Sequence, residues 1–177
     1  MAAVARAKGI DVETIRFEDW TPTGDYALVY AAQAWHWLDP AVSYDRAADA
    51  LAPGRSIALF WNRPEEFTGP LGADINAVYQ QLAPELVDGS TTWHLEQWGD
   101  RLDESGRFES ADRQSFPWIE RYSADEYTAL MQTHSNHRML PDAQREALHT
   151  AIHGVVVAHG GAVDVTYRAD LFLSRRS

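Results

Sequence analysis

The sequence predicts an α/β fold with a parallel β-sheet, because one stretch of the chain reads as strand, helix and strand. Residues 26–32 form an apolar run that is typical of a parallel strand covered on both faces. Asp39 and Pro40 then supply the N-cap and the first residue of a helix that should stop at the Pro-Gly pair 53–54. Residues 56–61 form a second apolar strand. A right-handed βαβ crossover places two such strands in one parallel sheet.

Further strand and helix patterns lie on both sides of this unit. The alanine-rich residues 1–8 favour a short helix that ends at Gly9. Residues 12–17 are rich in β-branched and aromatic side chains and predict a short strand. Apolar side chains recur at helical spacing over residues 71–82, and Pro84 limits that helix.

The middle of the chain predicts a short helix and an edge strand. Residues 97–104 favour a helix that ends near Gly106. Residues 111–119 read as a strand. Pro117 lies within that strand and indicates an edge position, because proline cannot donate to a central hydrogen-bond ladder.

The last third predicts a pair of helices and then a long strand. Residues 123–126 form a capping box that opens the first helix. Pro141 starts a second helix, which carries apolar residues on one face and is closed by the glycines at 160–161. Residues 163–173 alternate apolar and mostly polar side chains, which is the period of a strand with one buried face.

Composition and charge exclude several classes of function. The length of 177 residues suits one domain with a sizeable core, and the net charge of -11 argues against non-specific binding to nucleic acid or anionic membranes. The absence of cysteine excludes disulfides, thiolate metal sites and cysteine nucleophiles. No apolar run approaches the ~20 residues of a membrane helix, and the N-terminus lacks the apolar core of a signal peptide. We therefore expect a cytoplasmic protein.

Short motifs occur in a fixed order along most of the chain. In the first half they are Phe17-Glu18-Asp19-Trp20, the run 26–32, Ala34-Trp35-His36-Trp37 and Ala52-Pro53-Gly54. In the second half they are Tyr122-Ser123, Thr133-His134-Ser135, Leu140-Pro141, Gly160-Gly161 and Ser174-Arg175-Arg176. Together they resemble class I S-adenosylmethionine-dependent methyltransferases, and more narrowly the small-molecule, methyltransferase type 11-like branch.

The resemblance implies a Rossmann-like sheet ordered 3-2-1-4-5-7-6 with an antiparallel last strand. By chain order, strands three to seven would be 12–17, 26–32, 56–61, 111–119 and 163–173. Strands one and two, with the glycine-rich cofactor loop, have no counterpart. We therefore expect a single partial methyltransferase domain over 1–177, truncated at its N-terminus, in which 123–161 form a lid-like helical insertion. Two turns depart from the family pattern, at Asp25, which precedes Tyr26, and at Arg55.

The resemblance also implies S-adenosylmethionine as the cofactor. Glu18, Asp19 and Trp20 follow strand three at the carboxyl edge, where doubly wound sheets bind ligands. One carboxylate, with Asp19 preferred, would accept a hydrogen bond from the adenine amino group, and Trp20 would flank the base. The alternative interpretation is a charged loop whose tryptophan holds the turn.

Strand four would contribute the methionine side of the cofactor site. Ala31, Ala32 and Gln33 end this strand, and the backbone there would line the methionine part of the cofactor. Small side chains allow that close approach. The alternative is simple tight packing in a buried strand.

His36 is the candidate catalytic residue, between two tryptophans just past strand four. An imidazole with a pKa of about 6.5 could take a proton from a substrate hydroxyl or orient a carboxylate. Methyl transfer from a sulfonium depends mainly on proximity and alignment, so a base is optional. The alternative is a histidine that caps the helix start beside Asp39.

Other aromatic and histidine residues allow two interpretations. Six tryptophans could wall an apolar pocket or belong to the core: Trp35, Trp37, Trp61, Trp93, Trp98 and Trp118. His149 and His153 share a helix face, as paired metal ligands do, but no third ligand is apparent. We interpret them as solvated helix histidines, and His134 and His137 are no better placed for a metal. No metal is therefore expected.

Two functional hypotheses follow. In the first, the full-length parent transfers a methyl group from S-adenosylmethionine to a small organic molecule, at a carboxylate or hydroxyl oxygen. In the second, this form is a catalytically inert, truncated or degenerate module that acts only through protein interactions. Loss of strands one and two would expose the edges of strands three and four, so we also expect a homodimer through these edges.

Overall fold

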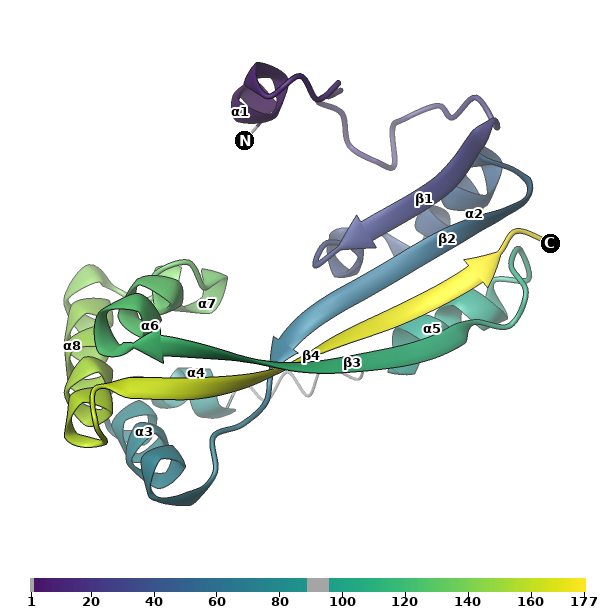
Figure 1. The fold of residues 1–177 in the computed structure, drawn as a ribbon. Helices are drawn as coiled ribbons and strands as arrows, with labels where there is room; N and C mark the ends of the chain where they lie inside the picture. The colour runs from purple at the N-terminus through teal and green to yellow at the C-terminus, as the bar shows by residue number, and fades with distance from the viewer. Residues whose placement is uncertain (1, 89–95) are drawn as a thin grey trace. The chain divides into compact units, whose positions relative to one another are not determined.

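The computed structural model describes residues 2–88 and 96–177, whose strands form a four-stranded sheet in the order β1-β2-β4-β3 (Figure 1). The strands are β1 (Tyr26–Ala32), β2 (Leu51–Pro64), β3 (Asp112–Ser123) and β4 (Ala162–Arg175). This order is that of strands 4-5-7-6 of the expected sheet. The predicted α/β class and neighbours are therefore confirmed.

Helices connect the strands, and all except the short ones at 35–37, 84–88 and 135–138 lie where the sequence predicts a helix. They are α1 (Ala2–Ala7), the 3₁₀ helix η1 (Trp35–Trp37), α2 (Pro40–Ala50), α3 (Gly69–Leu82), α4 (Pro84–Asp88), α5 (Glu96–Glu104), α6 (Ala124–Met131), α7 (Ser135–Arg138) and α8 (Asp142–Ala158). None of the helices described is both long enough and apolar enough to cross a membrane.

The predicted βαβ unit is present. β1 and β2 pair in parallel, and α2 connects them. The carboxylate of Asp39 accepts a hydrogen bond from the backbone nitrogen of Ala41 at 2.9 Å, which satisfies one donor of the first helical turn. Pro40 occupies that turn, as predicted.

Helix α2 ends earlier than the sequence predicts. The helix ends at Ala50, and Leu51 already begins β2, so the pair 53–54 lies inside the strand and not at the helix end. The pairing register between β1 and β2 shifts before Leu28. Gly54 has a φ of +69°, a left-handed conformation that glycine adopts readily at strand irregularities.

β4 runs antiparallel to β2. At one end of the pair, the backbone nitrogen of Glu65 donates to the carbonyl of Thr166 at 2.8 Å. At the other end, the nitrogen of Arg176 donates to the carbonyl of Arg55 at 2.7 Å. Residue numbers therefore rise along one strand as they fall along the other, which confirms the predicted direction of the last strand.

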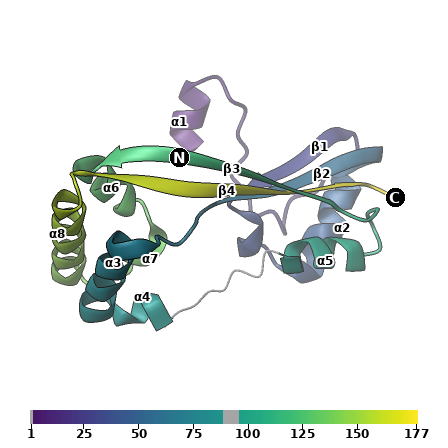
Figure 2. The same ribbon diagram turned by 60° about the horizontal axis from the view of Figure 1, so that its bottom comes forward.

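β3 forms the edge of the sheet beside β4 (Figure 2). Backbone bonds join Glu109 to Arg175 at 2.8 Å and Ala124 to Gly161 at 3.1 Å, again in antiparallel order. Pro117 lies in this strand, so the predicted edge position is confirmed.

The strand predicted at 12–17 is wrong. These residues form an irregular segment and the start of a turn, not a strand. Extended backbone becomes a strand only where a neighbour accepts its hydrogen bonds, and β1 pairs with β2 alone among the strands described. A β-branched pattern predicts an extended chain but supplies no partner.

The predicted coverage of β1 on both faces is also wrong. Leu28 and Tyr30 are 48% and 67% exposed, so one face of the strand is bare. Val29 and Ala31, on the alternate face, pack against the core. β1 is therefore a parallel strand at the edge of the described sheet.

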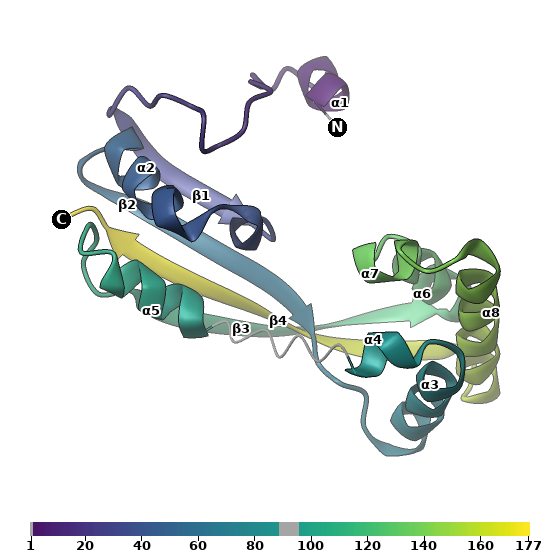
Figure 3. The same cartoon turned by 180° about the vertical axis from the view of Figure 1, so that it is seen from behind.

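Contacts divide the chain into two compact units, each with its own core. Unit 1 comprises 1–61, 95–114 and 171–177, and unit 2 comprises 62–94 and 115–170. In unit 1, α2 and α5 lie on the same face of the sheet, as opposite views show (Figures 1 and 3). Its most buried large side chains are Trp35, Leu51, Ile57, Leu59, Trp61 and Leu102.

Unit 2 is mainly helical. α8 packs against both α3 and α6 (Figure 2). Its most buried apolar side chains are Met131, Leu148, Ile152, Val156, Val163 and Val165. The segment 123–161, for which the sequence predicts a lid-like role, contains α6, α7 and α8. That role stays a prediction.

Candidate functional site

The carboxyl end of β1 carries the residues expected beside the methionine part of the cofactor. Ala31 and Ala32 pair with Leu59 and Phe60 of β2. The backbone nitrogen of Gln33 donates to the carbonyl of Phe60 at 3.0 Å, and Gln33 has a φ of +54°. This left-handed conformation, which is uncommon for a residue other than glycine, turns the chain sharply where the strand ends. Ala31 is half-buried and Ala32 is exposed, so backbone and small side chains form this edge.

The turn at 17–20 is tied to the start of α2 through Glu18. The Oε1 atom of Glu18 accepts a hydrogen bond from the backbone nitrogen of Asp39 at 3.1 Å, and the Glu18 side chain is 17% exposed. Hydrogen bonds from its own backbone nitrogen and from that of Asp39 lower the pKa of the Glu18 carboxyl. Glu18 therefore has a structural task, because part of its acceptor capacity is already used.

Asp19 lies next to Glu18 but is much more accessible. Its side chain is 66% exposed, and its Oδ2 lies 3.9 Å from Nε of Arg16. Such a long, solvated ion pair contributes little to stability and is easily exchanged for another partner. Of the two carboxylates, Asp19 is the more exposed, and its role toward the adenine stays a prediction.

Trp20 belongs to a row of aromatic rings. Its ring centroid lies 5.6 Å from that of Tyr26 and 5.9 Å from that of Phe17, which in turn lies 5.8 Å from the buried Trp35. A guanidinium nitrogen of Arg46 donates to the carbonyl of Trp20. These contacts hold the turn at 17–20 in place, which favours the structural interpretation of Trp20 and leaves its ligand role a prediction.

His36 is held by a buried tryptophan that the sequence analysis did not assign to it. Nε1 of Trp61 donates to Nδ1 of His36 at 3.2 Å, and burial lowers the pKa of the His36 imidazole. Since an indole can only donate, Nδ1 must be the acceptor, and the proton of the neutral ring lies on Nε2. His36 is therefore better suited to donate a hydrogen bond through Nε2 than to act as a base.

Three of the six tryptophans for which the sequence left pocket wall and core as alternatives belong to a core. Trp35, Trp61 and Trp98 are buried in the core of unit 1, with the Trp61 and Trp98 rings stacked at 6.0 Å. Trp118 stacks on Tyr167 at 4.5 Å. The core interpretation therefore holds for the buried three. Trp37 is 74% exposed, and Trp93 lies outside the described residues.

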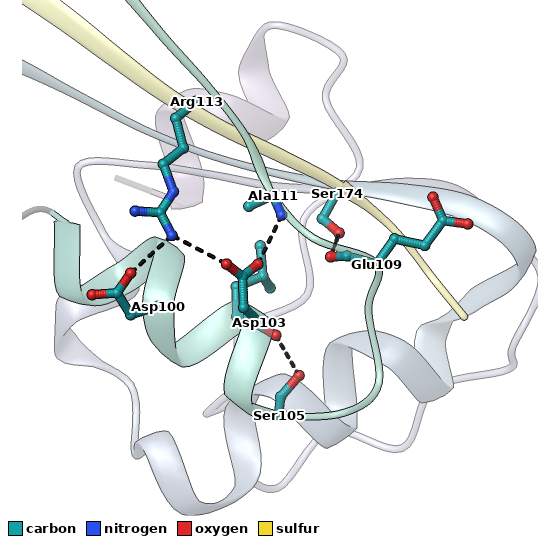
Figure 4. Close-up of polar contacts among 8 residues, drawn as sticks. Asp100, Asp103, Ser105, Glu109, Ala111, Arg113 and Ser174 are labelled. Atoms are coloured by element: carbon teal, nitrogen blue, oxygen red, sulfur yellow. Dashed lines mark hydrogen bonds and ion pairs between the residues drawn. The ribbon is translucent and has the colours of Figure 1, made fainter.

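A second polar cluster in unit 1 is structural (Figure 4). Nη2 of Arg113 lies 2.8 Å from Asp100 and 3.1 Å from Asp103, and Asp103 also accepts from the backbone nitrogen of Ala111 at 2.7 Å. The Asp100 and Asp103 carboxylates raise the pKa of the Arg113 guanidinium, with the bond to Asp100 as the largest cause. This network ties α5 to the start of β3, with one guanidinium shared by two carboxylates.

The surface cavities do not lie at the residues predicted to bind the cofactor. Cavities of about 400 and 470 Å³ in unit 1 border α2, and their linings include none of the residues predicted to bind cofactor. A cavity of about 930 Å³ in unit 2 is lined by α6, α7 and α8. Within residues 2–88 and 96–177, no three histidine, aspartate or glutamate side chains are grouped so as to hold a metal ion.

The histidines of unit 2 correct the sequence analysis. His149 is 6% exposed and His137 is 2% exposed, so neither is a solvated helix histidine. Helical spacing paired His149 with His153, whereas the structure joins His149 to His137 at 3.0 Å. His137 and His149 are 12 positions apart in the sequence, on either side of the start of α8, and no periodicity in the sequence indicates their contact.

Comparisons with known proteins reveal one short sequence match. No family model matches the sequence. A segment of 41 residues, 23% of this chain, is 46% identical to a protein of Mycobacterium tuberculosis (strain ATCC 25618 / H37Rv) that is named as an uncharacterized methyltransferase. The match spans 17% of that relative, which is far less than two thirds of its length.

Similarity to solved structures extends over much more of the chain. The YcgJ protein of Bacillus subtilis has a TM-score of 0.50 at 13% identity, covering 99% of this chain and 76% of that protein. A candidate type II methyltransferase from Anaeromyxobacter dehalogenans has a TM-score of 0.49 at 18% identity, over 88% of this chain and 66% of that protein. Matched structures also include methyltransferases in complex with S-adenosylmethionine or S-adenosylhomocysteine.

Identities this low establish the fold alone. The strand order, the parallel β1–β2 pair and the antiparallel β4 agree with the sheet that the sequence motifs predict. The chain has a Rossmann-like α/β fold, which it shares with the YcgJ protein.

Proposed function

We propose that this chain forms part of the cofactor site of an S-adenosylmethionine-dependent methyltransferase that acts on a small organic molecule, at a carboxylate or hydroxyl oxygen. The observation that carries the proposal is the parallel β1–β2 pair, since ligands of doubly wound sheets bind outside the carboxyl ends of such strands. The fold and the short match to a named methyltransferase support methyl transfer in general.

The side chains at this edge fit one part of the cofactor. Asp19 has an accessible carboxylate that would accept the hydrogen bond of the adenine amino group. Trp20 would flank the base, and Glu18 would hold the turn from behind through its bond to Asp39. The role of Glu18 is thus positioning, because its Oε1 already accepts a backbone hydrogen bond.

The strand end fits the reactive side of the cofactor. Ala31 and Ala32 present small side chains, and the turn at Gln33 brings backbone to the edge of the sheet. Bound S-adenosylmethionine supplies a methyl group on a sulfonium, whose displacement depends mainly on alignment. The contribution of this chain is then to position and to exclude water, not to take a proton.

His36 would serve as a hydrogen-bond donor. Its Nδ1 accepts from Trp61, so Nε2 carries the proton of the neutral ring. We propose that Nε2–H orients the acceptor carboxylate or hydroxyl. A donor of this kind works at any pH at which the ring is neutral, and burial extends that range downward by lowering the pKa of His36.

Calorimetric titration with S-adenosylhomocysteine tests the cofactor site. We expect binding by the wild-type chain and an affinity loss of about tenfold in Asp19→Asn, because a charged acceptor is replaced by a neutral one. Asp11→Asn is the matched control, since Asp11 is another exposed aspartate of the same N-terminal segment. Equal affinities of the two variants, or no heat of binding to the wild type, would refute the assignment.

A second candidate function rests on the bare face and open edge of β1. An unpaired strand edge is a template for another strand, and Tyr26, Leu28 and Tyr30 are exposed on or beside it. In this alternative the chain is inert and associates with a second copy of itself. Sedimentation should then show a dimer that Leu28→Lys dissociates, while Ile10→Lys, at a residue 56% exposed elsewhere, does not. A monomer at all concentrations contradicts it.

A further inference from the structure

The cavity of about 930 Å³ in unit 2 follows one face of α8. Six residues of that helix line it, at positions 142, 145, 146, 149, 150 and 153. Residues three or four positions apart lie on the same face of a helix, and each of these six has another member of the set at that spacing. They therefore form a single stripe on the helix surface. Every side chain of the stripe is polar or charged. The neighbouring stripe of α8, with Leu148, Ile152 and Val156, belongs to the core.

A buried hydrogen-bonded chain reaches this cavity from the core. The hydroxyl of Tyr79 lies 3.1 Å from Nε2 of His137, and Nδ1 of His137 lies 3.0 Å from Nε2 of His149. Burial raises the pKa of Tyr79 to about 12, lowers the pKa of His137 to about 4 and also lowers the pKa of His149, so all three groups are neutral near pH 7. His149 lies at the cavity end of this chain, with its Nδ1 remaining for a ligand.

The chain of three groups can run in either direction. If Tyr79 donates to His137, then His137 donates to His149, and Nδ1 of His149 carries a proton. If the order is reversed, Nδ1 of His149 accepts instead. The imidazole at the wall of the cavity can therefore match either a donor or an acceptor on a ligand without becoming charged.

The charges that line the cavity are partly paired among themselves. Arg145 lies 2.5 Å from Asp142, and His153 lies 2.8 Å from Asp125. The other two charged lining residues are Arg138 and Glu146, and neither forms an ion pair with another side chain of the described residues. One cation and one anion are thus left to face a ligand.

We propose that this cavity binds a small zwitterion, a molecule that carries both a carboxylate and an ammonium group, such as an α-amino acid. Arg138 holds the carboxylate, Glu146 holds the ammonium, and Nδ1 of His149 bonds a further polar group. A volume of about 930 Å³ is of the size that accepts a small organic ligand. The proposal concerns unit 2 alone and does not depend on methyl transfer.

Three ligands that differ in their charged groups distinguish a zwitterion site from a simple anion site or a simple cation site. L-norvaline carries both groups, pentanoate carries the carboxylate alone, and pentylamine carries the ammonium alone on the same carbon chain. Titrations of the full chain, followed by the ring signals of His149 in NMR spectra, should show norvaline binding about tenfold more tightly than either analogue. Tight binding of pentanoate alone would replace the zwitterion site with an anion site and overturn the proposal.

Two variants and two controls assign the contacts. Arg138→Gln and Glu146→Gln change exposed side chains, so the fold should be retained, and each should weaken norvaline binding about tenfold. Arg121→Gln and Glu120→Gln make the same changes at exposed positions of β3 outside the cavity and should bind as the wild type does. Equal binding by all four variants, or no response of the wild type to saturating norvaline, refutes the site. Titration with S-adenosylhomocysteine in parallel reports on the cofactor proposal separately.

Discussion

The polar side chains that could bind a ligand occupy different kinds of position in the two units. In unit 1 the candidate ligand groups lie at chain turns on the surface, where Asp19 is exposed and Gln33 ends a strand. In unit 2 the corresponding polar side chains are histidines between helices, of which His137 and His149 are almost fully buried. A site at strand ends is defined by chain order, whereas a site between helices is defined by packing. The first kind is much easier to recognise in a sequence.

The largest expected difference between the units is how strongly the free energy of unfolding depends on pH. Burial, followed by the nearby His134 and His149, lowers the pKa of His137 to about 4 from a usual value of 6.5. The unfolded chain therefore binds a proton between these values that the folded chain does not, so stability is complete above pH 6.5 and falls as the pH drops toward 4. The loss has an upper limit of about 3 kcal/mol.

Urea unfolding at a series of pH values between 4 and 7 measures the slope of the unfolding free energy against pH. The pKa of His137 sets this pH range. His137→Gln should reduce the slope, because the titrating ring is removed. His36→Gln, in unit 1, should leave most of it. A wild-type protein whose stability is constant over this range would show that the histidine network opens to solvent.

Two helix glycines give the next largest contrast. A Cβ atom on Gly99 of α5 would lie 2.8 Å from Cδ1 of the buried Phe172 and 2.9 Å from Nε of Arg113. Gly99→Ala should therefore cost about 2 kcal/mol of unfolding free energy through overpacking. Gly154 of α8 has nothing within 4 Å, so Gly154→Ala should stabilise by up to about 1 kcal/mol through helix propensity. Thermal unfolding of both variants checks the signs, and an unaffected Gly99→Ala would contradict the close packing of α5.

The link between His36 and Trp61 gives a smaller effect. His36→Phe leaves the buried Nε1 of Trp61 without its acceptor, which should cost about 1.5 kcal/mol. His36→Gln keeps an acceptor and should cost less. Tryptophan fluorescence during urea unfolding records both. If the two variants are equally stable, the ring of His36 is not what holds Trp61.

The helix caps give the smallest effect, and they should be equal in the two units. Asp39→Ala removes the cap of α2, and Ser123→Ala removes one half of the capping box of α6. Each should lower the unfolding free energy by about 1 kcal/mol. Asp39→Asn and Ser123→Thr keep a capping oxygen and serve as controls. A loss confined to one unit would show that only that unit unfolds under the conditions used.

Local signals in the sequence predicted the parts of the fold that depend on neighbouring residues. The cap at Asp39, the capping box at Ser123 and the proline in β3 each specify an element boundary or an edge by a mechanism that acts within a few residues. The order of strands followed from a family resemblance carried by many such motifs. Glu18 and Asp19 were predicted as site residues from their position after an expected strand end, but no strand forms at 12–17, and their role stays a prediction.

Features that depend on distant partners were missed. Residues 12–17 have the composition of a strand, but strand formation needs a neighbouring backbone, which composition does not reveal. Trp61 reaches His36 across 25 residues, and Tyr79 reaches His137 across 58. These pairs meet because secondary-structure elements pack together, and no spacing in the sequence encodes the contact.

The division into units has a consequence for how the chain can be dissected. The boundaries after residues 61, 114 and 170 fall inside β2, β3 and β4, so each of these strands contributes residues to both units. Unit 1 is assembled from three separate stretches of the chain, the last of which is the C-terminal end of β4 and the residues after it. A protease that nicks the backbone once between residues 61 and 171 would therefore leave unit 1 composed of two polypeptides.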